Sequence, residues 1–117
     1  MALPETPGTP VTVGDLDTAE PVPAGYVLLD VREQDEWDAG HAPGAVHIPM
    51  GELPERMDDI PEGELLVVCR SGGRSARSVQ WLNQVGFDAY NVSDGMKGWH
   101  RAGLPLTRDD GGEPEVI

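Results

Sequence analysis

The sequence predicts an α/β fold, in which a parallel sheet of five strands is flanked by helices. Short, nearly uninterrupted apolar runs alternate along the chain with segments of helical character. Strands that are apolar throughout are buried on both faces, as in a parallel sheet covered by helices. At 117 residues, with 38% hydrophobic and 25% charged residues, the chain has the length and composition of one globular domain.

Five short apolar runs are the candidate strands. In chain order they read VTV, YVLLDV, AVHIP, LLVVC and DAYNV, at residues 11–13, 26–31, 45–49, 65–69 and 88–92. The domain is expected to span residues 11–106. The three prolines of residues 1–10 and the acidic, glycine-bearing composition of residues 107–117 predict a flexible tail at each end.

Three helices are predicted between and after these strands. The segment 33–40, EQDEWDAG, is acid-rich in its first turn, which suits the positive end of a helix dipole, and its glycine can end the helix. Over residues 75–85 apolar positions recur every three residues, and Gly86 follows as a stop. The segment 95–103, GMKGWHRAG, is the last predicted helix.

The net charge of −13 argues against two classes of partner. With 8 basic against 21 acidic residues, the chain lacks the clustered lysine and arginine that bind nucleic acid or an anionic membrane surface. The amino terminus has no secretory signal pattern, and the longest apolar runs have only the length of strands. A single cysteine permits no intrachain disulfide. A cytoplasmic protein is therefore expected.

The only cysteine, Cys69, lies at the carboxyl end of the apolar run LLVVC, and the loop RSGGRS follows it. In open α/β sheets, ligands bind at this edge. Gly72 and Gly73 permit positive φ, so backbone N–H groups of the loop can converge on one anion, and the following helix adds its dipole. The helix and the nearby arginines also favour the thiolate form of Cys69, which is the expected nucleophile.

The charge pattern also indicates an anion site at this loop. Residues 65–87 contain three arginines and no acid, although an even spread of acids would place roughly four there. The alternative is that Cys69 is a small buried hydrophobic residue, the glycines form a plain turn and the arginines lie along the surface. The loop, the helix and the charge pattern together favour a functional site.

Three ordered segments, LLDVREQDEWDAGHAPGAVHIP, VVCRSGGRS and DGMKGW, resemble the rhodanese domain, a sulfurtransferase module, over about residues 26–105. The resemblance implies a three-layer rhodanese-like fold for residues 11–106, with no metal or organic cofactor. It also implies that Cys69 takes a sulfane sulfur from thiosulfate or a similar small anionic donor. The resulting persulfide then passes its sulfur to cyanide, a thiol or a protein acceptor.

The same resemblance makes residues 69–74 the active loop. Its backbone N–H groups would hold the persulfide, and Arg70 and Arg74 would attract the anionic donor. A CRxGx loop with a basic or hydroxyl residue at its sixth position looks like the thiosulfate-using type of this family. Beside the catalytic Cys69, the expected substrate-binding residues are Arg70, Ser71, Gly72, Gly73, Arg74 and Ser75.

The sequence gives weaker support for a functional role of the other polar residues. Asp30 and Arg32 match the DVR element of the family and are candidates for the border of the pocket, but a structural ion pair is favoured. His41 is interpreted as a residue that stabilises a turn, and His47 and His100 show no metal-ligand spacing. Packing in the core or at its edge is expected for the tryptophans Trp37, Trp81 and Trp99.

One position departs from the family pattern. The last motif usually has paired glycines before its hydrophobic residue, whereas this chain reads SDGM, with Asp94 in the first place. If it lies near the loop, this carboxylate would repel an anionic donor and lower the rate, or select a different acceptor.

Two other functions remain alternatives. A cysteine phosphatase or arsenate reductase uses a similar loop, but its signature places five residues between cysteine and arginine. Four residues separate Cys69 from Arg74, which favours sulfur over phosphate chemistry. The other alternative is a persulfide carrier or docking module with little turnover of its own. Loss of the cysteine is the usual mark of a silent module, and Cys69 is present.

Overall fold

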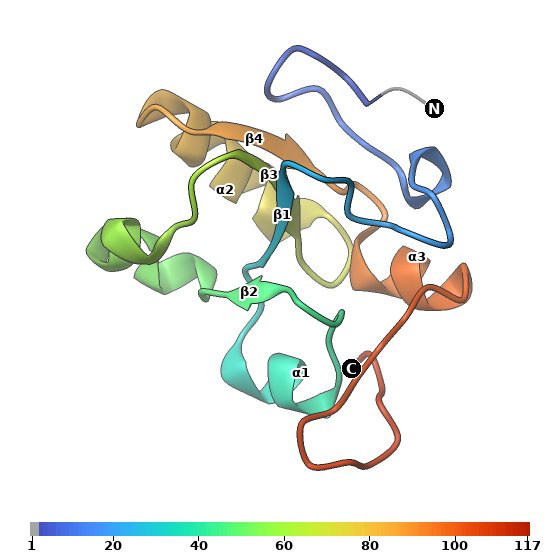
Figure 1. Cartoon of the computed structure of the whole chain (residues 1–117). Helices are drawn as coiled ribbons and strands as arrows, with labels where there is room; N and C mark the ends of the chain where they lie inside the picture. The colour runs from blue at the N-terminus through green and yellow to red at the C-terminus, as the bar shows by residue number, and fades with distance from the viewer. Residues whose placement is uncertain (1–2) are drawn as a thin grey trace.

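Four parallel strands form the sheet of the computed structural model, which describes residues 3–117 (Figure 1). The strands are β1 (Tyr26–Asp30), β2 (Val46–His47), β3 (Glu64–Val68) and β4 (Asp88–Asn91). They lie in the order β2-β1-β3-β4, and every neighbouring pair is parallel. The prediction of an α/β fold with a parallel sheet is therefore confirmed.

The predicted count of five strands is not confirmed. In place of the first predicted strand, Val11 forms one isolated parallel bridge with Val92, directly after β4. The chain then turns at Thr12 into a short 3-10 helix, η1 (Val13–Asp15), and the Thr12 N–H donates to the Asp15 carboxylate at 2.9 Å. This turn takes the chain away from the sheet after a single bridge.

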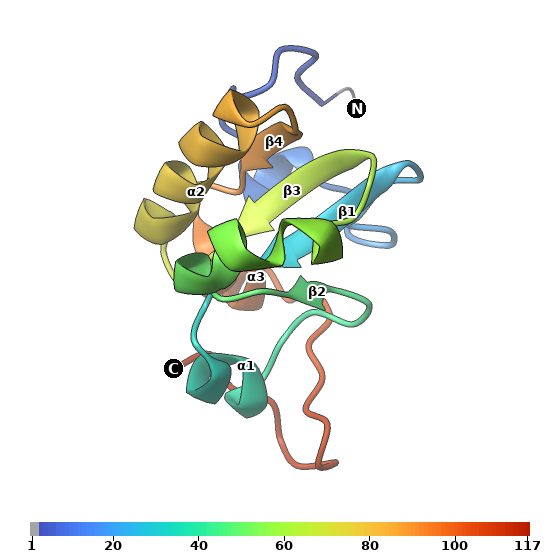
Figure 2. The same cartoon turned by 90° about the vertical axis from the view of Figure 1, so that its left-hand side faces the viewer.

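Helices cover both faces of the sheet (Figure 2). On one face lie α2 (Gly73–Gln84) and a 3-10 segment, η2 (Met50–Asp59), which the sequence did not predict. On the other face lie η1 and α3 (Gly95–Arg101), while α1 (Gln34–Ala39) follows β1. No helix among residues 3–117 is long and apolar enough to cross a membrane.

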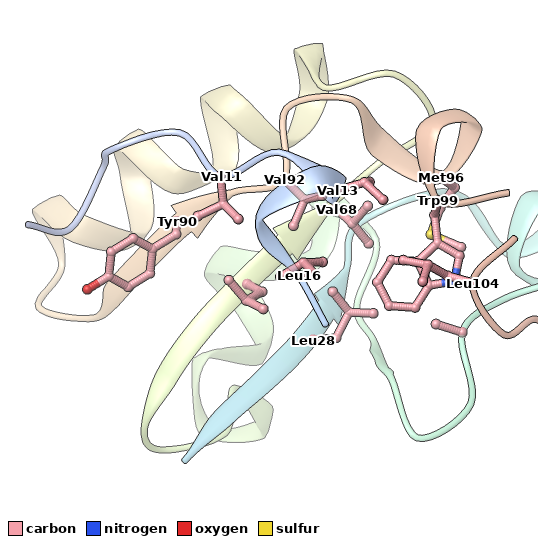
Figure 3. Packing of buried hydrophobic residues seen from close by; sticks show 12 residues of the cluster. Val11, Val13, Leu16, Leu28, Val68, Tyr90, Val92, Met96, Trp99 and Leu104 are labelled. Carbon is pink, nitrogen blue, oxygen red and sulfur yellow. The ribbon is translucent and has the colours of Figure 1, made fainter. Parts of the chain in front are cut away.

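The sheet separates two apolar clusters. Leu66 and Val68 of β3 belong to the cluster under η1 and α3, together with Trp99 (Figure 3). Leu65 and Val67 belong to the cluster under α2 and η2. Successive residues of a strand point to opposite faces, so the uninterrupted apolar run of β3 is buried on both sides, as the sequence predicted.

Both terminal segments contact the domain. The Gly8 N–H donates to a β4 carbonyl at 2.8 Å, and residues 1–2 of the predicted amino-terminal tail lie outside the described residues. At the other end, Thr107 forms an antiparallel bridge with His41, and the Glu115 N–H donates to an α1 carbonyl at 2.9 Å. The flexibility of the two tails stays a prediction, but each tail has defined contacts in the structure.

Candidate active site

Cys69 lies directly after β3, where the chain turns into α2. The residue is only 1% exposed. Its sulfur accepts a hydrogen bond from the Gly72 backbone N–H at 3.1 Å and lies 3.3 Å from the Ser75 hydroxyl oxygen. The loop therefore folds back over the sulfur, at the edge of the sheet where the sequence predicted a site.

Burial raises the pKa of the Cys69 thiol, because a charged sulfur loses its contact with water. Hydrogen bonds from the Ser75 hydroxyl and from the backbone N–H groups of Ser75, Gly72 and Ser71 act in the opposite direction. Their combined effect is larger, so the pKa lies below its ordinary value of 9.0. Hydrogen bonds, rather than the arginine charges expected from the sequence, are the main stabilisers of the thiolate.

The two glycines of the loop have different functions. Gly72 has a φ of +103°, and a Cβ at this position would lie 2.2 Å from the Ser93 carbonyl oxygen. Glycine is thus required here for both its backbone conformation and its size. Gly73 begins α2, and a Cβ there would meet no atom within 4 Å. Only the first of the two glycines shapes the turn.

The start of α3 holds the other side of the loop. The Met96 N–H donates to the Cys69 carbonyl at 2.8 Å, and the Lys97 N–H donates to the Arg70 carbonyl at 3.0 Å. Gly95 allows this approach, because a Cβ on it would lie 2.4 Å from the Arg70 carbonyl oxygen. The glycine of the SDGM motif therefore lets α3 pack against the active loop.

Arg74, which the sequence predicted to attract an anionic donor, is bound to Glu36 of α1. Two guanidinium nitrogens of Arg74 donate to the two carboxylate oxygens of Glu36 at 2.7 and 2.8 Å. This hydrogen bond is the main cause that lowers the pKa of the Glu36 carboxyl. The positive charge of Arg74 is thus balanced by a residue that the sequence had suggested only for the helix dipole.

Arg70 and Ser71, the other two predicted loop residues, are exposed. Within the described part of the chain, Arg70 forms no ion pair with a carboxylate. The loop therefore carries one unpaired cation, Arg70, next to Cys69 in sequence, and one paired cation, Arg74.

Ser75 and Asn91 form a buried polar pair beneath the loop. The Ser75 hydroxyl oxygen lies within hydrogen-bond distance of the Cys69 sulfur, the Gly72 carbonyl oxygen and the Asn91 side-chain oxygen. The Asn91 amide nitrogen donates to the Gly72 carbonyl at 3.2 Å. Asn91 was not predicted as a site residue, because only the pairing of β4 with β3, which matches it with Val67, places it beside the loop.

The chain matches the family model of the rhodanese-like domain over residues 15–102. It belongs to the rhodanese-like family. The chain is 44% identical over 73 residues to "Putative sulfurtransferase YtwF" of Bacillus subtilis, a match that covers 62% of this chain and 71% of the relative. It is 40% identical over 74 residues to "Putative sulfur carrier protein YrkF" of the same organism, covering 62% of this chain and only 40% of that protein.

Solved structures agree with this family membership. A crystal structure of a rhodanese-related protein from Thermoplasma volcanium superposes with a TM-score of 0.75 at 30% sequence identity. The superposition covers 85% of this chain and 97% of the other. The resemblance inferred from the three sequence motifs is therefore confirmed.

Asp30 and Arg32 form a buried ion pair in this rhodanese-like domain. Both residues are 0% exposed, and their side chains meet at 2.8 Å. Arg32 also donates to the carbonyls of Gly40 at 2.8 Å and Glu36 at 3.3 Å. The pair thus connects the end of β1 to the middle of α1 and to Gly40, which follows α1, and these contacts are those of a structural ion pair.

The Asp94 carboxylate contacts the start of η1. It accepts a hydrogen bond from the Val13 N–H at 2.9 Å, and its carbon atoms pack closely against Gly98. The departure from the paired-glycine pattern of rhodanese-like domains therefore has a structural use, because Asp94 fixes the amino-terminal segment to the start of α3.

Two histidines stack on one tryptophan near α1. The rings of His41 and Trp37 lie 3.6 Å apart at an interplanar angle of 1°, and His47 stacks on the same indole at 4.7 Å and 7°. A ring nitrogen of His41 lies 2.8 Å from the Trp37 carbonyl, and a ring nitrogen of His47 lies 2.7 Å from the Arg32 carbonyl. The contact of His41 fits the turn-stabilising role expected for this residue, and His47 also contacts a backbone carbonyl.

Proposed function

We propose that this rhodanese-like domain is a sulfurtransferase that moves a sulfane sulfur through a persulfide on Cys69. The donor is thiosulfate or a similar small anion, and the acceptor is cyanide, a thiol or a protein thiol. The observation that carries the proposal is the surroundings of the sulfur. A buried thiol with a lowered pKa faces the Gly72 N–H and the Ser75 hydroxyl.

The proposed transfer takes two displacements. In the first, the Cys69 thiolate attacks the outer sulfur of thiosulfate, a new S–S bond forms, and the S–S bond of thiosulfate breaks so that sulfite leaves with the electron pair. In the second, the acceptor attacks the outer sulfur of the persulfide, and Cys69 leaves as a thiolate. Cyanide becomes thiocyanate in this step. Charge and electrons balance, so no metal or redox cofactor is needed.

The contacts of the loop give its residues different roles in this reaction. Backbone N–H groups of Ser71, Gly72 and Ser75 stabilise negative charge on the sulfur, first as thiolate and then as persulfide. Arg70 is the unpaired cation that attracts the anionic donor. Arg74, which is bound to Glu36, anchors the start of α2 to α1 and contributes less attraction than an unpaired arginine.

A second candidate function is a persulfide carrier with little turnover of its own. The relative named as a sulfur carrier protein supports this candidate, although the chain covers only 40% of it. Both functions load sulfur onto Cys69, and they differ in whether a small acceptor unloads it repeatedly. A cysteine phosphatase is disfavoured, because the loop has four rather than five residues between Cys69 and Arg74.

The test is a mass measurement on the intact protein after incubation with thiosulfate. We expect a gain of one sulfur atom, its loss on addition of cyanide with formation of thiocyanate, and no gain for Cys69→Ala. Repeated cycles of thiocyanate formation indicate a sulfurtransferase, and a single stoichiometric release indicates a carrier. Absence of the adduct together with hydrolysis of an aryl phosphate would overturn both functions.

A further inference from the structure

The Ser75 hydroxyl has one proton but three neighbours that can accept it. These neighbours are the Asn91 side-chain oxygen, the Gly72 carbonyl oxygen at 3.2 Å and the Cys69 sulfur at 3.3 Å. Ser75 is 0% exposed, so water does not compensate for an unmade bond. The direction of this proton therefore decides which neighbour is stabilised.

The partners of Asn91 determine the orientation of its amide group. The Gly72 carbonyl can only accept, so the side-chain atom of Asn91 that faces it at 3.2 Å is the nitrogen. That carbonyl also accepts from the Ala76 N–H at 3.0 Å and is satisfied without Ser75. The oxygen of Asn91 consequently faces Ser75, and among the described residues the hydroxyl is its only hydrogen-bond donor.

Two acceptors with different needs then compete for one proton. When Cys69 is a neutral thiol, Ser75 donates to Asn91, and the thiol hydrogen can point to the Ser75 oxygen. When Cys69 carries a negative charge, a hydrogen bond to sulfur becomes charge-assisted and stronger. Turning the proton to sulfur leaves the buried oxygen of Asn91 without a donor, which opposes the turn.

We propose that Asn91 is a positioning residue that competes with Cys69 for the single proton of Ser75 and so limits how strongly that hydroxyl stabilises the sulfur anion. A thiolate that is stabilised less is a better nucleophile, whereas one that is stabilised more is a better leaving group. Under the proposed function, on which this consequence rests, Asn91 balances the loading of sulfur against its release. The competition itself does not depend on any donor or acceptor.

The test is a pH titration of the thiolate absorbance of Cys69 in the absence of any sulfur donor. Cys69 is the only cysteine, and Cys69→Ala supplies the blank. The tyrosines interfere little, because burial and the hydrogen bond to Glu64 raise the pKa of Tyr90 to about 12, and the pKa of Tyr26 is also raised, chiefly by burial. The measured midpoint therefore reports on Cys69 whether or not the domain transfers sulfur.

We expect Asn91→Leu, which removes the competing acceptor at nearly constant size, to lower this midpoint by about half a pH unit to one pH unit. Ser75→Ala should raise the midpoint, because it removes the donor. In the Ser75→Ala background, Asn91→Leu should cause no further shift. Asn91→Asp, whose carboxylate is a stronger acceptor and repels the thiolate, should raise the midpoint.

The matched control is Asn83→Leu. Asn83 exchanges hydrogen bonds of 3.1 and 2.8 Å with the Ala89 backbone, between the same helix and strand but away from the sulfur. It should lower the melting temperature and leave the midpoint unchanged. The proposal is overturned if Asn91→Leu leaves or raises the midpoint, or shifts it equally without Ser75. If Asn91→Leu does not fold, the titration of Asn91→Asp tests the proposal instead. A Cys69 midpoint in Asn91→Asp that is unchanged or lower than in the parent protein would then contradict it.

Discussion

The ion pair between Glu36 and Arg74 makes a prediction that depends on pH. Glu36→Gln keeps the shape of the side chain and removes its charge. The side chains of Arg74 and Glu36 are only 27% and 13% exposed, so the lost partner is poorly replaced by water. We expect a loss of about 1–3 kcal/mol in the free energy of unfolding. At about 2.1 cal/mol/K per residue, this loss lowers the melting temperature by about 4–12 °C.

The effect should disappear in acid. The pKa of Glu36 is lowered from 4.5, chiefly by the hydrogen bond from Arg74, so the folded state favours the charged carboxylate. A group of this kind contributes stability above its unfolded pKa, and the contribution is lost as the pH falls through the lower folded pKa. The melting temperatures of Glu36→Gln and of the parent protein should differ fully at pH 6–8, where a carboxyl is charged. They should converge below about pH 4, where the Glu36 carboxyl becomes protonated.

Asp38→Asn is the matched control for this experiment. Asp38 lies on the same helix, is exposed and pairs with the Gln34 amide at 2.8 Å rather than with a cation, so its loss should change the melting temperature little. A difference between Glu36→Gln and the parent protein that stays constant from pH 3 to pH 8 would refute the electrostatic reasoning. Glu36→Gln also frees Arg74, so we expect a lower KM for thiosulfate with stronger salt dependence.

Three further substitutions test the loop and its supports. Arg70→Ala should raise the KM for thiosulfate about fivefold, which corresponds to the loss of an exposed ion pair worth about 1 kcal/mol. The control Arg77→Ala, on the exposed side of α2, should leave this KM unchanged. Gly72→Ala should lower the melting temperature by about 8 °C or more, from strain and contact with a backbone oxygen, whereas Gly73→Ala should not lower it. Asp94→Ala removes the hydrogen bond from the Val13 N–H and should lower the free energy of unfolding by about 1 kcal/mol. The rate of sulfur loading onto Cys69 should stay that of the parent protein. Slower loading by Asp94→Ala would contradict the assigned structural role.

The apolar runs were sufficient to predict β1 and β3, because these strands consist mostly of apolar residues and are largely buried. β4 was also predicted, although its exposed Asp88 and its Asn91 are polar. The same signal failed at residues 11–13, where a turn into η1 interrupts the run after one bridge. It also missed η2, because Pro54 lies inside residues 50–59 and an internal proline is typical of a turn or a helix break. The predicted helix 75–85 begins earlier, since Gly73 already has a helical conformation.

The site residues divide in a similar way. Cys69 and its loop could be predicted because they are contiguous in sequence, and their relation to a strand and a helix follows from local patterns. Glu36 and Asn91 could not be predicted, because they lie 38 and 16 residues from their partners Arg74 and Ser75. Only the packing of α1 and the register of β4 bring them to the loop.

The recessed position of Cys69 restricts the shape of a protein that could accept its sulfur. The residue is 1% exposed, and a disulfide or sulfur transfer between two chains requires the sulfur atoms to meet at bonding distance. The burial of Cys69 beneath its own loop disfavours a disulfide between two copies of this domain. Under the proposed function, an acceptor protein would need to carry its cysteine on a narrow, projecting segment of chain to reach this sulfur.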